Sequence, residues 1–425
     1  MSDVHPFQAL RYDTRRIDLG RVIVPPYDVI AASDRAAFFD RDPHNAIRLE
    51  LTRDVRDQEA TDYAEIPRTL AAWQKSGVLI RDPRPGLYPL RQSFDAPDGT
   101  HTVRLGFFGL IRLESYARRV VRPHERTLEG PKADRLKLLR AARANLSSVF
   151  LLYEDRTDEL APELTEGFDA CVVGRASDDT GTLHELARID DPARIERIRD
   201  FLAERPAVIA DGHHRYETAL NYRDECRARY PDAGPSAPWE FTLVYFANAF
   251  APGSLLLPIH RLIKTAAMPS DAVWAERLPG WRRRDVSVAS AGEIPALLAK
   301  HLTPLSDRRA FAVDDASGTL RIFSKPLDAS GELTIRVLHR DVIAGVFGLD
   351  DAAVAHGAAT FPEIDRGLER ALRIVDGAVA LYLNPLAPED VFRVTEAGDV
   401  LPQKSTYFHP KLPTGLVFRT HEDPP

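Results

Sequence analysis

Cysteine is nearly absent from this chain of 425 residues, which contains only Cys171 and Cys226. Two cysteines exclude a disulfide scaffold and a zinc site with several cysteine ligands, and they suit a reducing compartment. The chain also lacks any apolar run of about 18 residues, the length that a membrane-spanning helix needs. Its first residues have no apolar signal core. The sequence therefore predicts a soluble, cytoplasmic protein with no membrane partner.

Positive charge is also in deficit, because 56 Lys and Arg residues face 63 Asp and Glu residues, for a net charge of −7. An acidic chain is a poor general ligand for nucleic acids, so nucleic-acid binding is not expected and any basic site must be local. The patterns of zinc proteases, serine hydrolases and dinucleotide-binding folds are absent as well. These absences remove the commonest enzyme classes.

Signals for strands and helices alternate along the chain, and its 32 Pro and 24 Gly residues are scattered rather than gathered into linkers. This alternation predicts an α/β fold of the mixed α+β kind, with mixed sheets and flanking helices. We expect strands at 46–52, 88–94, 101–113 and 255–263, and a helix at 132–144. A change of composition near 154–167 suggests two regions, 1–155 and 156–425.

The central feature is an apolar run at 206–210, expected to be a strand, that leads into a polar turn and a helix start. Gly212 would let the backbone turn tightly, and the positive end of the helix dipole would favour an anion there. Arg215 could grip two oxygens, and the histidines could move protons near neutral pH. A capped helix start without a ligand would give the same pattern. The turn consists of Asp211, Gly212, His213, His214 and Arg215.

A second charged block occupies 122–135. Lys132 and Arg135 would place two cations on one face near a helix N-terminus, where the helix dipole opposes them, and an anion would relieve that conflict. A solvated surface loop is the alternative. The candidate site residues of this block are His124, Glu125, Lys132, Asp134 and Arg135.

A third block lies near the C-terminus, at 402–411. Its cations and hydroxyls suit phosphate oxygens or a carboxylate, although a loop that docks its aromatic residues for stability is the alternative. Asp28, which follows two prolines and Tyr27, is a candidate metal or substrate contact. The candidate binding residues of the third block are Lys404, Ser405, Thr406 and Lys411.

The turn at Gly212 resembles the phosphate-binding motif of the ParB and sulfiredoxin-like superfamily, in which a strand leads through Gly-x-x-Arg into a helix. It is most similar to the free-serine kinase branch, which implies a superfamily element around residues 200–230, nucleotide phosphates held at the turn, and an acidic residue that assists the hydroxyl or the metal. Sulfiredoxins carry Cys where His213 stands, so sulfinate reduction is not implied.

Five blocks in order also resemble the family called domain of unknown function 1015. They are the segments 6–11, 25–30, 124–135, 211–216 and 404–411. Members of that family are associated with serine biosynthesis and with a phosphatase or kinase role linked to phosphoserine. The resemblance implies that the block at 124–135 forms a second wall of the pocket.

These observations predict a phosphotransferase or phosphohydrolase acting on a small phosphorylated metabolite, such as phosphoserine, or on serine with ADP or ATP. Gly212, Arg215, Lys132, Arg135 and Lys404 would neutralise phosphoryl oxygens. Asp211 and Glu125 would activate the attacking group, with His213 or His214 as acid or base. Asp211 or Asp28 would hold a Mg²⁺ ion.

Two other functions remain open from the sequence. One is a ParB-like nucleotide-binding regulator or DNA-associated protein without metabolic turnover, and the other is a catalytically silent ligand-binding protein. The sequence favours neither direction of phosphoryl transfer and no particular oligomer.

Overall fold

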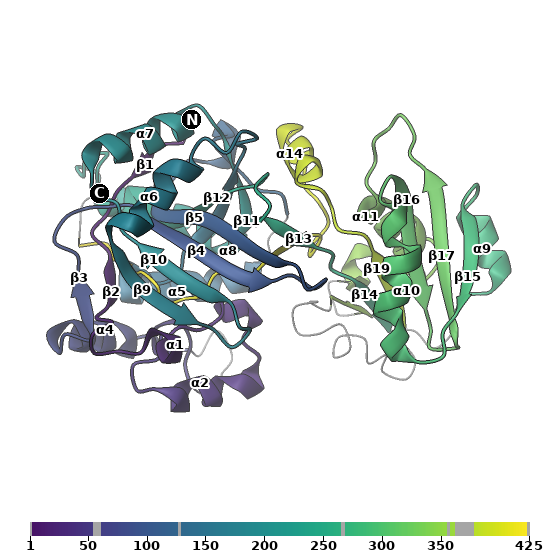
Figure 1. Ribbon diagram of the computed structural model, residues 1–425, viewed down its shortest axis with the longest axis horizontal. Helices are drawn as coiled ribbons and strands as arrows, with labels where there is room; N and C mark the ends of the chain where they lie inside the picture. Colours follow the sequence, from purple (N-terminus) through teal and green to yellow (C-terminus); the bar gives the residue numbers. More distant parts are fainter. Residues whose placement is uncertain are drawn as a thin grey trace. The chain divides into compact units, whose positions relative to one another are not determined.

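The computed structural model describes residues 2–53, 61–125, 129–264, 268–354, 358–361 and 378–422. The chain forms two compact units (Figure 1). The first comprises Met1–Leu255 and Pro410–Pro425, and the second comprises Leu256–His409. Position 155, where composition suggests a boundary, lies inside the first unit, because strands before and after it pair in one sheet.

The elements of the first unit alternate between strands and helices. They are β1 (Val4–His5), β2 (Leu10–Tyr12), α1 (Leu19–Val22), α2 (Arg35–Arg41), α3 (Ile47–Glu50), α4 (Glu65–Lys75), β3 (Leu79–Arg81), β4 (Tyr88–Asp95), β5 (His101–Arg112), β6 (Val121–Arg122), α5 (Glu129–Ala142), β7 (Ala144–Asn145), β8 (Val149–Tyr153), α6 (Ala161–Ala170), β9 (Val172–Ser177), β10 (Leu183–Ala187), α7 (Pro192–Ala203), β11 (Ala207–Asp211), α8 (His213–Arg229), β12 (Phe241–Asn248) and β21 (Arg419–Thr420).

Nine strands of this unit form a mixed sheet in the order β6-β11-β8-β12-β5-β4-β10-β9, with β1 added to β5. The pairs β11·β6 and β12·β8 are parallel, and the other pairs are antiparallel. Helices α6, α7 and α8 contribute to one apolar core with the strands, through side chains such as Leu164, Ile198 and Tyr216. The strand β11 is fully buried except at Asp211, so the sheet delivers that carboxylate to its edge.

The second unit contains its own sheet and helices. Its elements are β13 (Leu255–Leu257), β14 (Arg261–Lys264), α9 (Asp271–Arg277), β15 (Arg282–Ser287), α10 (Ile294–His301), β16 (Arg308–Asp314), β17 (Thr319–Pro326), α11 (Thr334–Val337), a π-helix (Leu338–Ala344), α12 (Asp351–Ala353), β18 (Ala359–Thr360), β19 (Ala378–Leu383), α14 (Pro388–Glu396) and β20 (Tyr407–His409).

The sheet of the second unit has six antiparallel strands in the order β15-β17-β16-β19-β14-β18. Side chains alternate between its faces, as the period of a strand requires. Phe311 and Val313 pack toward a core that includes Trp274. Ala310 and Ala312 face a second core. The strand β13, which begins at Leu255, pairs with β20, so the chain leaves the first unit beside the place where it returns.

The mixed α/β fold agrees with the expectation from the sequence, but two local predictions are wrong. The segment 46–52, expected as a strand, contains the short helix α3, because the side chain of Asn45 accepts a hydrogen bond from Ile47 N and favours a helical turn. The segment 255–263 is two strands, interrupted at Pro258.

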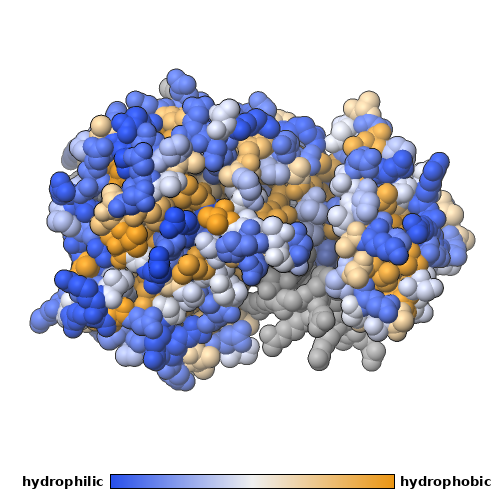
Figure 2. Space-filling view, in the orientation of Figure 1, coloured by the Kyte–Doolittle hydropathy of each residue, from blue (hydrophilic) through white to orange (hydrophobic). Residues whose placement is uncertain are grey.

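No helix among the described residues combines the length and the apolar character needed to span a membrane. Hydrophilic side chains cover much of the visible face of each unit, with smaller hydrophobic patches between them (Figure 2).

Candidate functional site

The turn between β11 and α8 has the geometry that its sequence predicts. Gly212 adopts φ +89°, a left-handed conformation that side chains rarely tolerate, and α8 begins at His213. A Cβ atom at Gly212 would lie 2.9 Å from Nε of Arg215. Glycine is therefore required twice, for the backbone turn and for the close approach of a guanidinium.

Asp211 is bound by two cations that are far apart in the sequence. Arg215 donates from Nη2 to one carboxylate oxygen at 2.8 Å, and Lys411 donates from Nζ to the other at 3.2 Å. The three side chains are between 12% and 19% exposed. Burial opposes the charged form of Arg215, but the carboxylates of Asp211 and Asp28 outweigh it and raise its pKa. Two positive charges thus share one half-buried carboxylate at the start of a helix.

Arg215 also reaches across to the segment before β8. Its Nη1 donates to the carbonyl oxygen of Ser148. Its Nε is buried and has no hydrogen-bond partner among the described residues. A buried donor left in this state costs about 1–3 kcal/mol, so a ligand oxygen that reached it would recover that energy.

His124, which is buried, contacts His213, which is half-buried. Their rings meet edge to face with centroids 4.7 Å apart. His213 Nε2 accepts a hydrogen bond from the backbone N–H of His124 at 3.3 Å, and His124 Nδ1 bonds to the carbonyl oxygen of Ile209. Burial, and then the neighbouring His124, hold the pKa of His213 well below its ordinary value. His213 is therefore neutral at physiological pH, with Nε2 already occupied.

His214 is the more accessible of the two adjacent histidines on α8. Burial lowers its pKa, while the charges of Glu217, Asp28 and Glu125 oppose that shift. Glu217 in turn forms an ion pair with Lys132 at 3.1 Å. Lys132 on α5 is therefore brought beside α8, where it pairs with the carboxylate of Glu217.

Arg135 is the centre of a buried polar cluster. It donates to both the carbonyl oxygen and the carboxylate of Glu50, to the hydroxyl of Tyr63 and to the carboxylate of Asp134. The cluster occupies all five N–H donors of the guanidinium, which also lies 4.2 Å from the ring centroid of Tyr27. Arg135 has no donor left for a ligand in this arrangement.

Sequence reasoning missed Glu50 and Tyr27 as parts of this region. Glu50 is 1% exposed, and its carboxylate forms an ion pair with Arg135 at 3.1 Å. Burial raises the pKa of Glu50, and the charges of Arg135 and Arg215 oppose the shift. A charged residue within the apolar segment 46–51 was the available signal, because a buried carboxylate is costly unless it is paired.

Asp28 lies within electrostatic reach of both Arg215 and His214. Within the described ranges, no group of three or more His, Cys, Asp and Glu side chains is arranged to hold a metal. Mg²⁺ needs only one or two protein carboxylates when phosphate and water complete its shell. Asp28 fits that requirement better than Asp211, whose two oxygens are already in ion pairs.

The third block divides between the two units. Lys411 belongs to the first unit and reaches Asp211, whereas Lys404, Ser405 and Thr406 belong to the second unit. Lys404 adopts φ +55°, and the hydroxyl of Ser405 donates to the carbonyl oxygen of Pro402 at 2.6 Å. The structure thus brings the turn at Gly212 together with His124, Glu125, Lys132 and Lys411 in the first unit.

Comparison with solved structures finds distant likenesses. A C-terminally truncated SbnI from Staphylococcus aureus is 10% identical, with a TM-score of 0.35, and the match covers 73% of this chain and 86% of that one. A conserved hypothetical protein from Pyrococcus furiosus is 12% identical with a TM-score of 0.35, covering 74% and 96%. A free serine kinase mutant in complex with ADP is 12% identical with a TM-score of 0.35, covering 73% and 92%. Scores at this level carry no structural or functional argument.

Comparison with curated proteins gives no match. The family model described as "Protein of unknown function (DUF1015)" matches residues 4–297, which is more than half of the chain and includes the turn at Gly212 and the block at 124–135. The chain therefore belongs to the DUF1015 family.

Proposed function

We propose that this protein is a phosphotransferase or phosphohydrolase for a small phosphorylated metabolite, with its site at the turn between β11 and α8. One observation carries the proposal: Arg215 and Lys411 converge on the single carboxylate of Asp211 at the N-terminus of a helix of 17 residues. Two cations and a helix N-terminus, all of which attract anions, therefore meet at one turn.

A phosphoryl group would enter by replacing Asp211 as the partner of these cations. A phosphoryl group carries more negative charge than one carboxylate and offers three oxygens in place of two. The buried Nε of Arg215 would gain an acceptor in the exchange. Binding of a phosphoryl group at this turn would therefore give the buried Nε of Arg215 the hydrogen-bond acceptor that it lacks among the described residues.

Once displaced, the carboxylate of Asp211 would accept the proton of the attacking hydroxyl or water. The new bond forms at phosphorus as the bond to the leaving oxygen breaks, and His214, which is neutral because burial lowers its pKa, would relay a proton from water to that oxygen. We assign this proton transfer to His214 rather than His213, because Nε2 of His213 is bound by the backbone of His124. Glu125 acts on His214 through its charge.

Lys132 and Arg135 take different parts in this proposal. Lys132 would turn from Glu217 toward the phosphoryl oxygens, exchanging the carboxylate for the phosphoryl group as its partner. Arg135 is a positioning residue that fixes Tyr27 and Glu50. Asp28 would hold a Mg²⁺ ion, which supplies further charge neutralisation when bound. The substrate within this class is phosphoserine, or serine with a nucleotide.

The test is a turnover screen of the purified protein against phosphorylated metabolites, including phosphoserine, with and without ADP or ATP and Mg²⁺. Arg215→Lys keeps the charge and loses the planar fork, so we expect kcat/KM for the active substrate to fall about 100-fold. Arg140→Lys is the matched control, because Arg140 pairs with Glu225 on an exposed face. Absence of turnover with every substrate, or equal turnover by the Arg215 variant, contradicts the proposal.

A further inference from the structure

We propose that the second unit contains a separate binding site for a free α-amino acid with an apolar side chain. The candidate is a cavity of about 340 Å³ formed by residues of the second unit. At about 30 Å³ per water molecule, this space equals roughly eleven waters. That is room for a ligand of about ten non-hydrogen atoms, the size of leucine. The inference does not depend on the phosphoryl site, which lies in the first unit.

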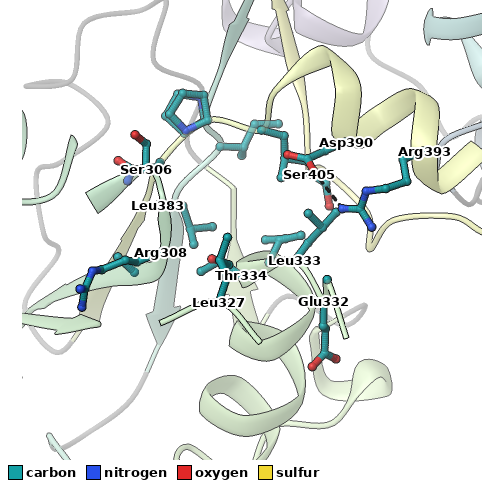
Figure 3. A pocket seen from close by; sticks show the side chains of 18 residues that line it. Ser306, Arg308, Leu327, Glu332, Leu333, Thr334, Leu383, Asp390, Arg393 and Ser405 are labelled. Carbon is teal, nitrogen blue, oxygen red and sulfur yellow. Dashed lines mark hydrogen bonds and ion pairs between the residues drawn. The ribbon is translucent and has the colours of Figure 1, made fainter. Parts of the chain in front are cut away.

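The cavity has an apolar centre, with Asp390, Arg393 and Ser405 at one end and Ser306, Arg308 and Glu332 elsewhere on its wall (Figure 3). Leu333, Thr334 and Leu383 lie at the centre, where α11 begins and β19 ends. Asp390 and Arg393, one turn apart on α14, gather with Ser405 at the other end. A ligand that fills the space must therefore combine a short apolar body with a polar head.

The polar end offers one cation and one anion side by side. Arg393 donates from Nη2 to a carboxylate oxygen of Asp390 at 2.9 Å. The other oxygen of Asp390 accepts the N–H of Ala387 at the start of the helix. A Cβ atom at Gly331 would lie 3.5 Å from Nη1 of Arg393, so the guanidinium extends over that glycine at the cavity wall.

Ser405 decides which group of the ligand faces which side chain. Its hydroxyl is buried and donates its one hydrogen to the carbonyl oxygen of Pro402. The oxygen retains only acceptor capacity. Ser405 and Asp390 therefore match a donor such as an ammonium group, while Arg393 matches a carboxylate.

These contacts favour a zwitterion over ligands of one charge. Asp390 would repel a phosphate or a simple carboxylate bound to Arg393. Arg393 would repel an amine bound to Asp390. Each of these like-charge contacts weakens binding. A zwitterionic head satisfies both side chains and brings no net charge into the cavity. Its apolar side chain would displace water from Leu333 and Leu383.

The experiment is isothermal titration of the full chain with L-leucine and with three matched probes. Isocaproate lacks the ammonium group, isoamylamine lacks the carboxylate, and glycine lacks the apolar side chain. We expect saturable binding of L-leucine at one site per chain, and affinity at least about tenfold weaker for each probe. No saturable binding of L-leucine, or equal binding of isocaproate or isoamylamine, overturns the proposal.

Two variants locate the binding in this cavity. Arg393→Gln removes the cation, and Asp390→Asn removes the anion but keeps an acceptor for Ala387 N. Each should weaken L-leucine binding about tenfold while the far-UV circular dichroism and melting temperature stay close to native. Arg68→Gln is the control, since Arg68 forms an i,i+3 pair with Glu65 on α4 of the first unit. Native affinity in both cavity variants, or equal loss in the control, rejects the site.

Discussion

At the scale of single residues, Gly212 connects the backbone of the turn to the charge of the site. Its positive φ directs the chain from β11 into α8, and its missing side chain lets Arg215 lie against the backbone. Many glycines in this chain adopt positive φ, but few have a guanidinium where a Cβ would be. Gly181 has positive φ but no such neighbour, so alanine substitutions at Gly212 and Gly181 form a matched pair.

Gly212→Ala and Gly181→Ala should have the same backbone cost and different effects on the site. Both positions are left-handed, at φ +89° and +83°, so each alanine should lower the free energy of unfolding by about 1–2 kcal/mol. Nothing lies within 4 Å of a Cβ at Gly181, whereas a Cβ at Gly212 would displace Arg215. Urea unfolding should therefore give similar losses, and only Gly212→Ala should weaken phosphate binding. Equal phosphate affinity in the two variants would show that the position of Arg215 does not matter for phosphate binding.

At the scale of elements, a polar network crosses neighbouring strands and ends at the segment that carries Lys411. On β5, Arg104 is 1% exposed, and its guanidinium lies 4.8 Å from the ring centroid of Phe150. It donates to the side chain of Gln92 on β4 and to the carbonyl oxygen of Pro410. Gln92 in turn donates to the carbonyl oxygen of Lys411 at 3.5 Å. The sheet thus fixes the backbone from which Lys411 reaches Asp211.

Arg104→Met should cost both stability and ligand affinity. The variant leaves Gln92 and Pro410 without a charged donor, and hydrogen bonds of that kind contribute about 1.5–3 kcal/mol each, so we expect a loss of about 3 kcal/mol in urea unfolding. Lys411→Met is the comparison, because the side chain of Lys411 is at the turn rather than under the sheet. It should weaken phosphate binding to the same degree and leave stability within about 1 kcal/mol. Unchanged phosphate affinity in Arg104→Met would show that the polar network of Arg104 and Gln92 does not affect ligand binding at the turn.

The sequence predicted those elements whose signals are local. The strand β11, the turn and α8 follow from an apolar run, a glycine and helical spacing, and the hairpin of β4 and β5 follows from its turn residues. The partners of Arg135 and the pairing of Lys411 with Asp211 could not be predicted in this way, because they depend on tertiary packing between distant segments. The helix α3 was missed because a four-residue helix is too short to show a helical period.

At the scale of the whole molecule, the second unit is inserted between β12 and the C-terminal segment of the first. That segment is held firmly. Arg419 on β21 is 1% exposed and donates to the carbonyl oxygens of Phe241 and Pro238 and to the side chain of Asn145. The first unit is therefore built from two chain segments, Met1–Leu255 and Pro410–Pro425. The described contacts between these segments do not involve the second unit.

Replacing residues 256–409 with a short Gly-Ser linker should leave the first unit folded. The linker has little distance to span, because β13 pairs with β20 where the chain leaves and returns. Calorimetry should show one cooperative transition, and the shortened chain should bind phosphate like the full one. A chain truncated after residue 409 is the comparison and should lose that transition, because it lacks β21 and the buried hydrogen bonds of Arg419. If the shortened chain has no cooperative transition, the two units are not independent.

The ion pair of Lys411 with Asp211 also limits how early a newly made chain can form this contact. The two residues are 200 positions apart, and at about 5–20 residues per second a ribosome would need roughly 10–40 s to travel from one codon to the other. A nascent chain can build β11 and α8 during that interval, but it would do so with Arg215 alone opposite the carboxylate. Interrupted translation products would accordingly carry the turn and lack its second cation.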